Sequence, residues 1–315
     1  MDDSFGKRRG LQTVSTAEGL FTILPLDHLA PFRKILRPES PESVTHAEVV
    51  SAKLALVRAL APHASAVLLD AIYSLAPAIA AGALPGHVGL MAAIEDGDDA
   101  SAGQSGRLLA DWTVAKIKRI GAAAVKFYFF YNPDDAPTAA AQERLVSELV
   151  SDCRRYDLPF FAEPVAYGGG DRRRLVVEAA RRIGQLGVDV LKMEFPVDVR
   201  HESDETIWMS ACEALSRASP APWALLSAGV DFETFARQLT IACRAGASGY
   251  IAGRAIWQEA LSRAGADREN FIRQTVIPRM DTLNKIVNQH GRPWTGFYPN
   301  SAALIPENWR AHYAA

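Results

Sequence analysis

Eight short apolar runs, separated by helix-like segments, most constrain how this 315-residue chain can fold. The runs do not alternate strictly between apolar and polar residues, which is the pattern of strands covered on both faces. The segments between them are amphipathic, and several end in the glycine expected just past a helix C-terminus. The eight runs occupy residues 21–27, 65–70, 87–94, 123–130, 158–165, 188–195, 222–229 and 248–253.

A repeated strand and helix order predicts an α/β fold with a parallel sheet and right-handed crossovers. Eight repeats favour a closed (β/α)8 TIM barrel over an open sheet. No GxGxxG motif follows the first run, which further disfavours a dinucleotide-binding fold. Because no Pro-, Gly- or Ser-rich linker divides the chain, we predict a single domain over 1–315, with N- and C-terminal extensions. Its barrel core covers about 20–260, and a C-terminal helix and tail cover 261–315.

Composition narrows the classes of partner. The chain is 49% hydrophobic and 22% charged, with a formal net charge of −2, so it offers no basic footprint for nucleic acid or an anionic membrane. The N-terminus lacks a secretory signal pattern, and we expect a cytoplasmic protein that binds small molecules. Three scattered cysteines suggest neither a disulfide framework nor a thiolate metal site.

Polar residues interrupt or end the apolar runs in a consistent way. In a barrel of this type, functional side chains gather at the C-terminal ends of the strands. Ionisable groups are too numerous there for a structural core alone. In strand order, these polar residues are Asp27, Asp70, Glu95 with Asp96, Lys126, Glu163, Lys192 with Glu194, Ser227 and Arg254.

The run "VLKMEF" contains a lysine among apolar residues. The strand period of two puts Lys192 and Glu194 on one face, so Lys192 points into the barrel if the other face packs under helices. Burial near another cation, such as Lys126, disfavours the charged ammonium and favours an amine nucleophile that forms a Schiff base with a carbonyl. The alternative is an internal Lys192–Glu194 ion pair that only ties strands together.

Carboxylates on neighbouring strands favour the catalytic interpretation. Forming and hydrolysing a Schiff base needs a proton donor and acceptor, and cleaving a carbon–carbon bond needs a base for the hydroxyl proton. Glu163 and Asp27 can supply both, whereas a structural ion pair needs neither residue.

Two turns with small residues, in "LLSAGVDFETF" and "GYIAGRAIW", follow runs seven and eight. Such turns expose backbone N–H groups at a helix N-terminus, where phosphate binds readily, and phosphate sites recur there in this architecture. Taken singly, each turn also fits an ordinary strand-to-helix connection. The candidate phosphate ligands are Ser227, Gly229, Gly253 and Arg254.

Seven blocks carry a family resemblance: "LPLDH", "LLDAIY", "VKFYFFYNPDD", "FFAEP", "LKMEFPV", "LSAGV" and "AGRAIW". Over about residues 20–260 their order and spacing resemble the class I tagatose-1,6-bisphosphate aldolases and the related sulfofructose-phosphate aldolases. The resemblance implies a barrel that cleaves a phosphorylated ketose into dihydroxyacetone phosphate and an aldehyde, without a metal or other cofactor. The ketose would be similar to tagatose or fructose 1,6-bisphosphate, or to 6-deoxy-6-sulfofructose 1-phosphate.

The resemblance also implies roles for residues. Lys192 would be the Schiff-base lysine and Glu163 the proton shuttle, while Asp27 and Lys126 would orient the lysine and the substrate hydroxyls. The phosphate of the dihydroxyacetone phosphate half would contact Ser227, Gly229, Gly253 and Arg254. Glu194 would be a supporting residue at the substrate site.

One departure from the family concerns the end of the first run. Family members usually continue after the aspartate with glutamine and arginine, whereas this chain has His28 and Leu29. The aldehyde half therefore stays open: it is phosphorylated, sulfonated or uncharged. A charged half would need other anchors, for example Arg33, Lys34 or Arg37. His28 is either a hydroxyl ligand or an ordinary loop histidine.

Other functions remain as alternatives. A zinc-dependent aldolase needs several histidines at strand ends, and of the seven histidines only His28 clearly ends a run, so we expect no metal site. Asp70, Glu95 and Asp96 are more typical of a solvated rim than of a Mg²⁺ site. A non-catalytic sugar-phosphate-binding protein and a barrel isomerase with Glu163 as base are also open. The aromatic residues after 293 predict packing against the body or a partner subunit in a homo-oligomer.

Overall fold

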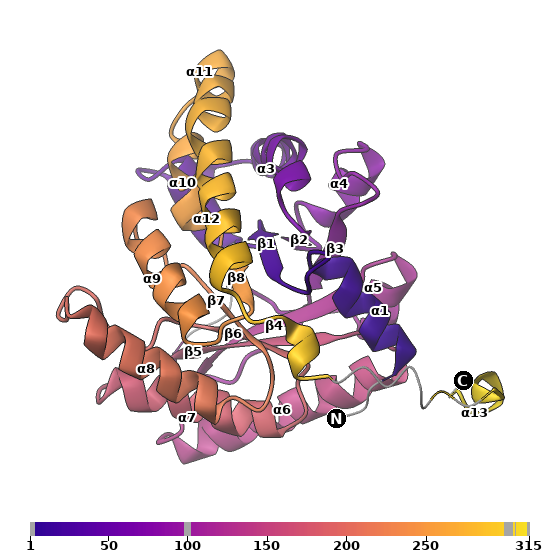
Figure 1. Cartoon of the computed structure of the whole chain (residues 1–315). Helices are drawn as coiled ribbons and strands as arrows, with labels where there is room; N and C mark the ends of the chain where they lie inside the picture. The colour runs from indigo at the N-terminus through magenta and orange to yellow at the C-terminus, as the bar shows by residue number, and fades with distance from the viewer. Residues whose placement is uncertain (1–3, 98–101, 299–304, 306, 314–315) are drawn as a thin grey trace.

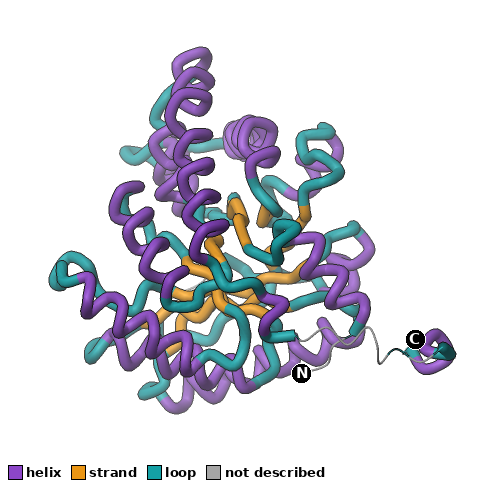
Figure 2. Tube along the Cα trace, in the orientation of Figure 1, coloured by secondary structure: helices purple, strands orange, loops and turns teal. Residues whose placement is uncertain are grey.

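A computed structural model describes residues 4–97, 102–298, 305 and 307–313. Eight parallel strands close into one barrel in sequence order, β1 to β8, and helices surround it (Figures 1 and 2). The predicted (β/α)8 fold is confirmed. The strands are β1 (Phe21–Pro25), β2 (Ala66–Leu69), β3 (Gly89–Ala93), β4 (Ala124–Tyr131), β5 (Phe160–Ala166), β6 (Val190–Met193), β7 (Trp223–Leu225) and β8 (Gly249–Ile251).

The helices follow the strands with a few additions. Helix α1 precedes the barrel, and a π-helical turn (Ile272–Val276) joins α11 to α12 just before Pro278, which lacks the N–H that a helix interior needs. The helices are α1 (Phe5–Val14), α2 (Ala30–Leu36), α3 (His46–Leu60), α4 (Leu75–Ala80), α5 (Val114–Arg119), α6 (Ala136–Arg155), α7 (Arg172–Gln185), α8 (Glu205–Ala218), α9 (Phe232–Arg244), α10 (Arg254–Leu261), α11 (Gly265–Phe271), α12 (Ile277–His290) and α13 (Trp309–His312).

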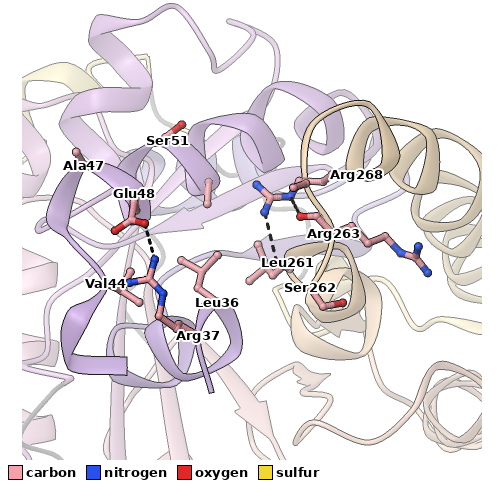
Figure 3. A pocket seen from close by; sticks show the side chains of 12 residues that line it. Leu36, Arg37, Val44, Ala47, Glu48, Ser51, Leu261, Ser262, Arg263 and Arg268 are labelled. Atoms are coloured by element: carbon pink, nitrogen blue, oxygen red, sulfur yellow. Dashed lines mark hydrogen bonds and ion pairs between the residues drawn. The ribbon is translucent and has the colours of Figure 1, made fainter. Parts of the chain in front are cut away.

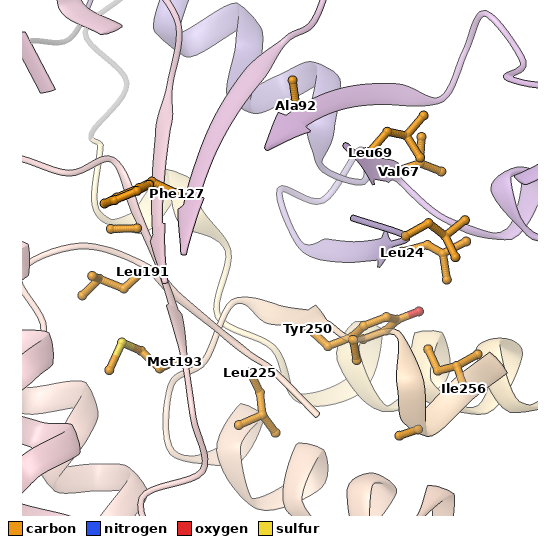
Figure 4. Close-up of a cluster of buried hydrophobic side chains, with 14 of the residues drawn as sticks. Leu24, Val67, Leu69, Ala92, Phe127, Leu191, Met193, Leu225, Tyr250 and Ile256 are labelled. Carbon is orange, nitrogen blue, oxygen red and sulfur yellow. The ribbon is translucent and has the colours of Figure 1, made fainter. Parts of the chain in front are cut away.

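Strand alternation divides the core into two layers. Outward residues such as Leu24, Leu191 and Met193 pack under the helices in one continuous apolar cluster (Figure 4). Inward residues such as Phe161 and Val190 fill the barrel in a second cluster. Because successive strand side chains point to opposite faces, the inward positions two residues further along β5 and β6 are Glu163 and Lys192. The barrel interior thus changes from apolar to charged towards the C-terminal ends of the strands.

The N-terminal end of the barrel is closed by α1 and by the segment after α12. Lys7 of α1 donates to Asp189 at 2.8 Å, and Tyr298 donates to the carbonyl of Asp189 at 2.6 Å. Trp294 is buried and donates to Ser15 Oγ. The aromatic residues Trp294 and Tyr298 therefore pack against the body of the same chain. Among the described helices, none is both long enough and apolar enough to cross a bilayer.

Candidate active site

A cavity of about 360 Å³ opens at the C-terminal ends of the strands. Six residues predicted for the site line it together, contributed by five different strands or the turns that follow them. They are Asp27, His28, Lys126, Glu163, Lys192 and Arg254. Barrel closure has therefore brought to one cavity side chains that are up to 227 positions apart in the sequence (254 − 27).

Lys192, the third residue of β6, is only 4% exposed. Its Nζ lies 2.8 Å from Glu163 Oε1 on the neighbouring strand β5. Glu163 is the only carboxylate paired with Lys192 among the described residues. A proton can pass between them directly at this distance, which would leave a free amine beside a neutral carboxylic acid.

Lys126 on β4 has a different environment. Its Nζ lies 2.8 Å from Asp27 Oδ2 and 2.9 Å from Glu163 Oε2, and it also pairs with Glu95. Burial lowers the pKa of Lys126, but the three carboxylates outweigh burial and hold that pKa well above its usual value. Lys126 is therefore a permanent cation that positions carboxylates, and it is unsuited to be the nucleophile.

Burial and neighbouring charges also shift the pKa values of Asp27, Glu95 and His28. Burial raises the pKa of Asp27, but Lys126 and Lys192 outweigh it, so this pKa lies well below its usual value. Glu95 shows the opposite result, because burial raises its pKa more than Lys126 lowers it. For His28, burial outweighs Asp27 and lowers the pKa to about 3, with Arg254 adding to the shift. The imidazole is thus neutral at physiological pH.

The predicted phosphate end lies where the turns after β7 and β8 meet. Arg254 is the first residue of α10, and a Cβ at Gly229 would be 3.3 Å from its Nη1, so the guanidinium lies against the β7 turn. Gly253 allows a close approach, because a Cβ there would be 2.7 Å from the carbonyl of Pro25. Ser227 is buried beside this turn. Arg254 Nε is buried and has no hydrogen-bond partner within the described part of the chain.

Glu194 does not line the cavity of Lys192, and neither does Gly229. Its carboxylate accepts from Arg172 Nη2 at 2.9 Å and from the backbone N–H of Ala166 at 2.7 Å. It lines a neighbouring cavity with Arg172 and Gly229 rather than the cavity of Lys192. Strand β6 ends at Met193, so the alternation that places Lys192 does not extend to Glu194. The alternative of a Lys192–Glu194 ion pair was therefore wrong, because Lys192 pairs with Glu163 and Glu194 with Arg172, whereas the supporting role of Glu194 at the substrate stays a prediction.

Two residues were missed as members of the site. Glu95 had been treated as part of a solvated rim, yet its carboxylate is buried against Lys126. Tyr128 lines the cavity one strand period after Lys126, with that Nζ 5.3 Å from its ring centre. The period-two pattern of β4 could have predicted Tyr128, because it faces the same way as Lys126.

Asp70, the remaining strand-end aspartate, has a structural environment. Its carboxylate accepts from Lys53 and from the backbone N–H groups of Ile72 and Tyr73. Among the described residues, no group of three or more His, Cys, Asp or Glu is arranged to hold a metal ion.

The chain is similar in sequence to known aldolases. The sequence model of the DeoC/LacD family aldolases matches residues 24–259. The chain is 31% identical to tagatose 1,6-diphosphate aldolase 2 of Enterococcus faecalis, over 92% of this chain and 96% of that protein. It is 30% identical to the tagatose 1,6-diphosphate aldolase of Staphylococcus aureus, over 93% and 99% of the two chains. The chain belongs to the DeoC/LacD family of aldolases.

Membership in the DeoC/LacD family makes the protein an enzyme, a lyase that acts as an aldolase. The crystal structure of an archaeal fructose 1,6-bisphosphate aldolase superposes with a TM-score of 0.63 at 19% identity, covering 89% of this chain and 98% of that one. At that identity the likeness supports the barrel fold alone. The roles of individual residues in the DeoC/LacD aldolase must therefore be argued from its own cavity.

Proposed function

We propose that this aldolase is a Schiff-base-forming (class I) enzyme that reversibly cleaves a phosphorylated ketose into dihydroxyacetone phosphate and an aldehyde. The observation that carries the proposal is the 2.8 Å contact between Lys192 Nζ and Glu163 Oε1 inside the cavity. The high pKa of Lys126 removes the other lysine of the cavity as a nucleophile. The similarity to two tagatose 1,6-diphosphate aldolases supports the choice of a ketose phosphate.

In the forward reaction, Lys192 transfers a proton to Glu163 and its free amine attacks the ketose carbonyl. Glu163 then protonates the carbinolamine oxygen, which leaves as water and gives an iminium ion. The iminium accepts the electron pair of the breaking C3–C4 bond, while a carboxylate takes the proton of the C4 hydroxyl and the aldehyde leaves. Protonation of the enamine carbon and hydrolysis release dihydroxyacetone phosphate and restore Lys192.

The surrounding residues would position these groups. Lys126 would hold the carboxylates of Asp27 and Glu163 in place through contacts of 2.8 and 2.9 Å. Its positive charge would neutralise one of their two negative charges, and both carboxylates would face the reacting carbons. Arg254, together with the backbone N–H groups of Gly229 and Gly253, would hold the phosphate. This arrangement anchors one end of the substrate and leaves the carbonyl beside Lys192.

Trapping tests the proposal directly. The protein is incubated with dihydroxyacetone phosphate, reduced with borohydride and mapped by peptide mass spectrometry. We expect one adduct on Lys192, and no adduct in the Lys192→Met variant. Lys126 provides an internal control because it lies in the same cavity. An adduct on Lys126, or full activity in Lys192→Met, would contradict the mechanism.

A further inference from the structure

The cations of the cavity limit how many anionic groups a substrate can carry. Among the described residues, the lysines and arginines that line it are Lys126, Lys192 and Arg254. The positions outside the described ranges contain no lysine or arginine in the sequence. Lys126 already faces three carboxylates, and Lys192 is the proposed nucleophile. Arg254 is therefore the one charged side chain of this cavity left to hold a phosphate. In the neighbouring cavity, which Gly229 lines, Arg172 and Arg200 are paired with Glu194 and Asp198.

Uncharged residues of the cavity lining, among them Leu29, Gly97 and Tyr128, form a neutral wall. In a closed ring of eight strands, β4 lies across the barrel from β8, and Tyr128 of β4 lines the cavity there. Leu29 and Pro31 follow β1, the neighbour of β8 in the barrel, and Gly97 follows β3. The side chain of Leu29 is 4% exposed and lies 3.5 Å from the Cβ position of Gly97, so it joins the loops after β1 and β3.

The cation beside this wall is already paired, because Lys126 contacts Asp27, Glu95 and Glu163. Asp27 and Glu95 lie in the same cavity, and the pKa of Asp27 is low enough to keep it ionised. His28 adds no positive charge, because burial lowers its pKa to about 3. A second phosphate or a sulfonate on this side would face carboxylate without a cation to pair with.

The alternative anchors lie elsewhere. Arg33 donates to the hydroxyl of Tyr73 at 2.8 Å. Arg37 pairs with Glu48 at 2.7 Å in a separate cavity between the α2–α3 region and the end of α10, where Arg263 and Arg268 also lie (Figure 3). Lys34 is exposed on α2. These three side chains do not line the cavity of Lys192.

We propose that the aldehyde half of the substrate is uncharged, so that the enzyme acts on a ketose 1-phosphate whose far end carries only hydroxyl groups or hydrogens. This inference rests on the proposed function and names its substrate class. Leu29 and Tyr128 are the residues that set the preference. The far hydroxyl groups have neutral partners available in the Tyr128 phenol and in His28 Nδ1, which is buried without a hydrogen-bond partner in the described ranges.

The test uses the aldol condensation of dihydroxyacetone phosphate with a panel of aldehydes. Glycolaldehyde, lactaldehyde and glyceraldehyde represent the uncharged class, and glyceraldehyde 3-phosphate and 3-sulfolactaldehyde the anionic class. We expect the best uncharged aldehyde to exceed both anionic ones in kcat/KM by about tenfold or more, the ratio that one unpaired buried charge readily produces. A wild-type preference for an anionic aldehyde would overturn the inference.

Substitution at Leu29 sharpens the result. Leu29→Arg should shift the kcat/KM ratio towards glyceraldehyde 3-phosphate by about tenfold, because it adds a charged hydrogen-bond donor to the neutral wall. Leu29→Met is the matched control, because it lengthens the side chain without adding charge. Its kcat/KM ratio should still favour the uncharged aldehydes, as in wild type. If Leu29→Arg does not fold, Tyr128→Lys adds a cation to the opposite part of the wall with the same expected shift. An unchanged ratio in the folded cationic variant counts against the inference.

Borohydride trapping separates this inference from the function on which it rests. If dihydroxyacetone phosphate is trapped on Lys192 but anionic aldehydes react best, only the inference fails. The same holds if Lys192 is trapped and no aldehyde of the panel reacts. Without an adduct on Lys192, the aldolase mechanism and the inference both fail.

Discussion

The two ends of the barrel each contain a buried lysine–carboxylate contact of 2.8 Å, yet their surroundings differ. At the N-terminal end Lys7 pairs with Asp189, and at the C-terminal end Lys192 pairs with Glu163. Lys7 and Lys192 have the same small exposure, 4% each. Neither distance nor burial distinguishes the Lys7–Asp189 pair from the Lys192–Glu163 pair that we propose to be catalytic.

The two ends differ in how many buried polar atoms lack a hydrogen bond. Asp189 also accepts the backbone N–H of Phe160 at 2.9 Å, and Tyr298 covers its carbonyl, so this end is sealed. At the other end, three buried atoms have no hydrogen-bond partner in the parts of the chain that the structure describes: Glu95 Oε2, His28 Nδ1 and Arg254 Nε. Since buried polar groups are normally satisfied, these atoms indicate a place for a ligand.

The largest expected effect is the loss of proton transfer at the C-terminal end. Glu163→Gln keeps the shape but removes the acid and base function, so kcat should fall roughly 10²- to 10⁴-fold. Steady-state cleavage assays measure it. Glu194→Gln is the matched control, because Glu194 is a buried glutamate paired outside the cavity. Equal losses in the two variants would remove the assignment of Glu163.

At the sealed end, substitution should affect stability instead of chemistry. Lys7→Met leaves Asp189 buried without its cation and should lower the free energy of unfolding by roughly 3–5 kcal/mol. Urea unfolding measures this, and the kcat of the folded fraction should match wild type. Adding Asp189→Leu should restore much of the loss, because the uncompensated charge is then gone. If Lys7→Met instead lowered kcat and left the free energy of unfolding unchanged, Lys7 would have a role in the reaction and its structural assignment would be wrong.

Arg254 tests whether an unpartnered atom at the open end marks a ligand site. Arg254→Ala should raise KM for a phosphorylated ketose roughly 10- to 100-fold, the worth of a charged hydrogen bond. The effect should be absent for the same ketose without phosphate. Equal losses with both substrates would show a structural role similar to that of Lys7.

The smallest effect concerns His28 and pH. Its folded pKa of about 3 lies below the ordinary 6.5, so the unfolded state binds the proton first as pH falls. Stability from the neutral imidazole is complete above pH 6.5 and is lost progressively between 6.5 and 3. Between pH 7 and 5.5, wild type should lose about 1 kcal/mol more than His28→Gln in urea unfolding. If the free energy of unfolding changed with pH in the same way in wild type and His28→Gln, the pKa of His28 would not be lowered by burial, which would indicate that the imidazole is hydrated.

Local patterns in the sequence determined the barrel and the direction of its main functional side chains. Eight apolar runs with helical segments between them predicted the fold, and the period of two aimed Lys192 inward because alternation is a property of any strand. The same rule did not predict the partner of Glu194, Arg172, because it holds only within a strand and β6 ends at Met193. The turns after β7 and β8 likewise made Arg254 a candidate phosphate ligand, and that role stays a prediction.

Only the tertiary structure decided which groups meet. Lys126 is surrounded by carboxylates from β5 and from the ends of β1 and β3, and no local pattern fixes distances between residues so far apart in sequence. The neutral wall of Leu29 and Tyr128 arises in the same way, since barrel closure places separate loops around one cavity. Sequence spacing sets the face of each side chain, whereas closure sets its neighbours, and therefore its charge and its chemistry.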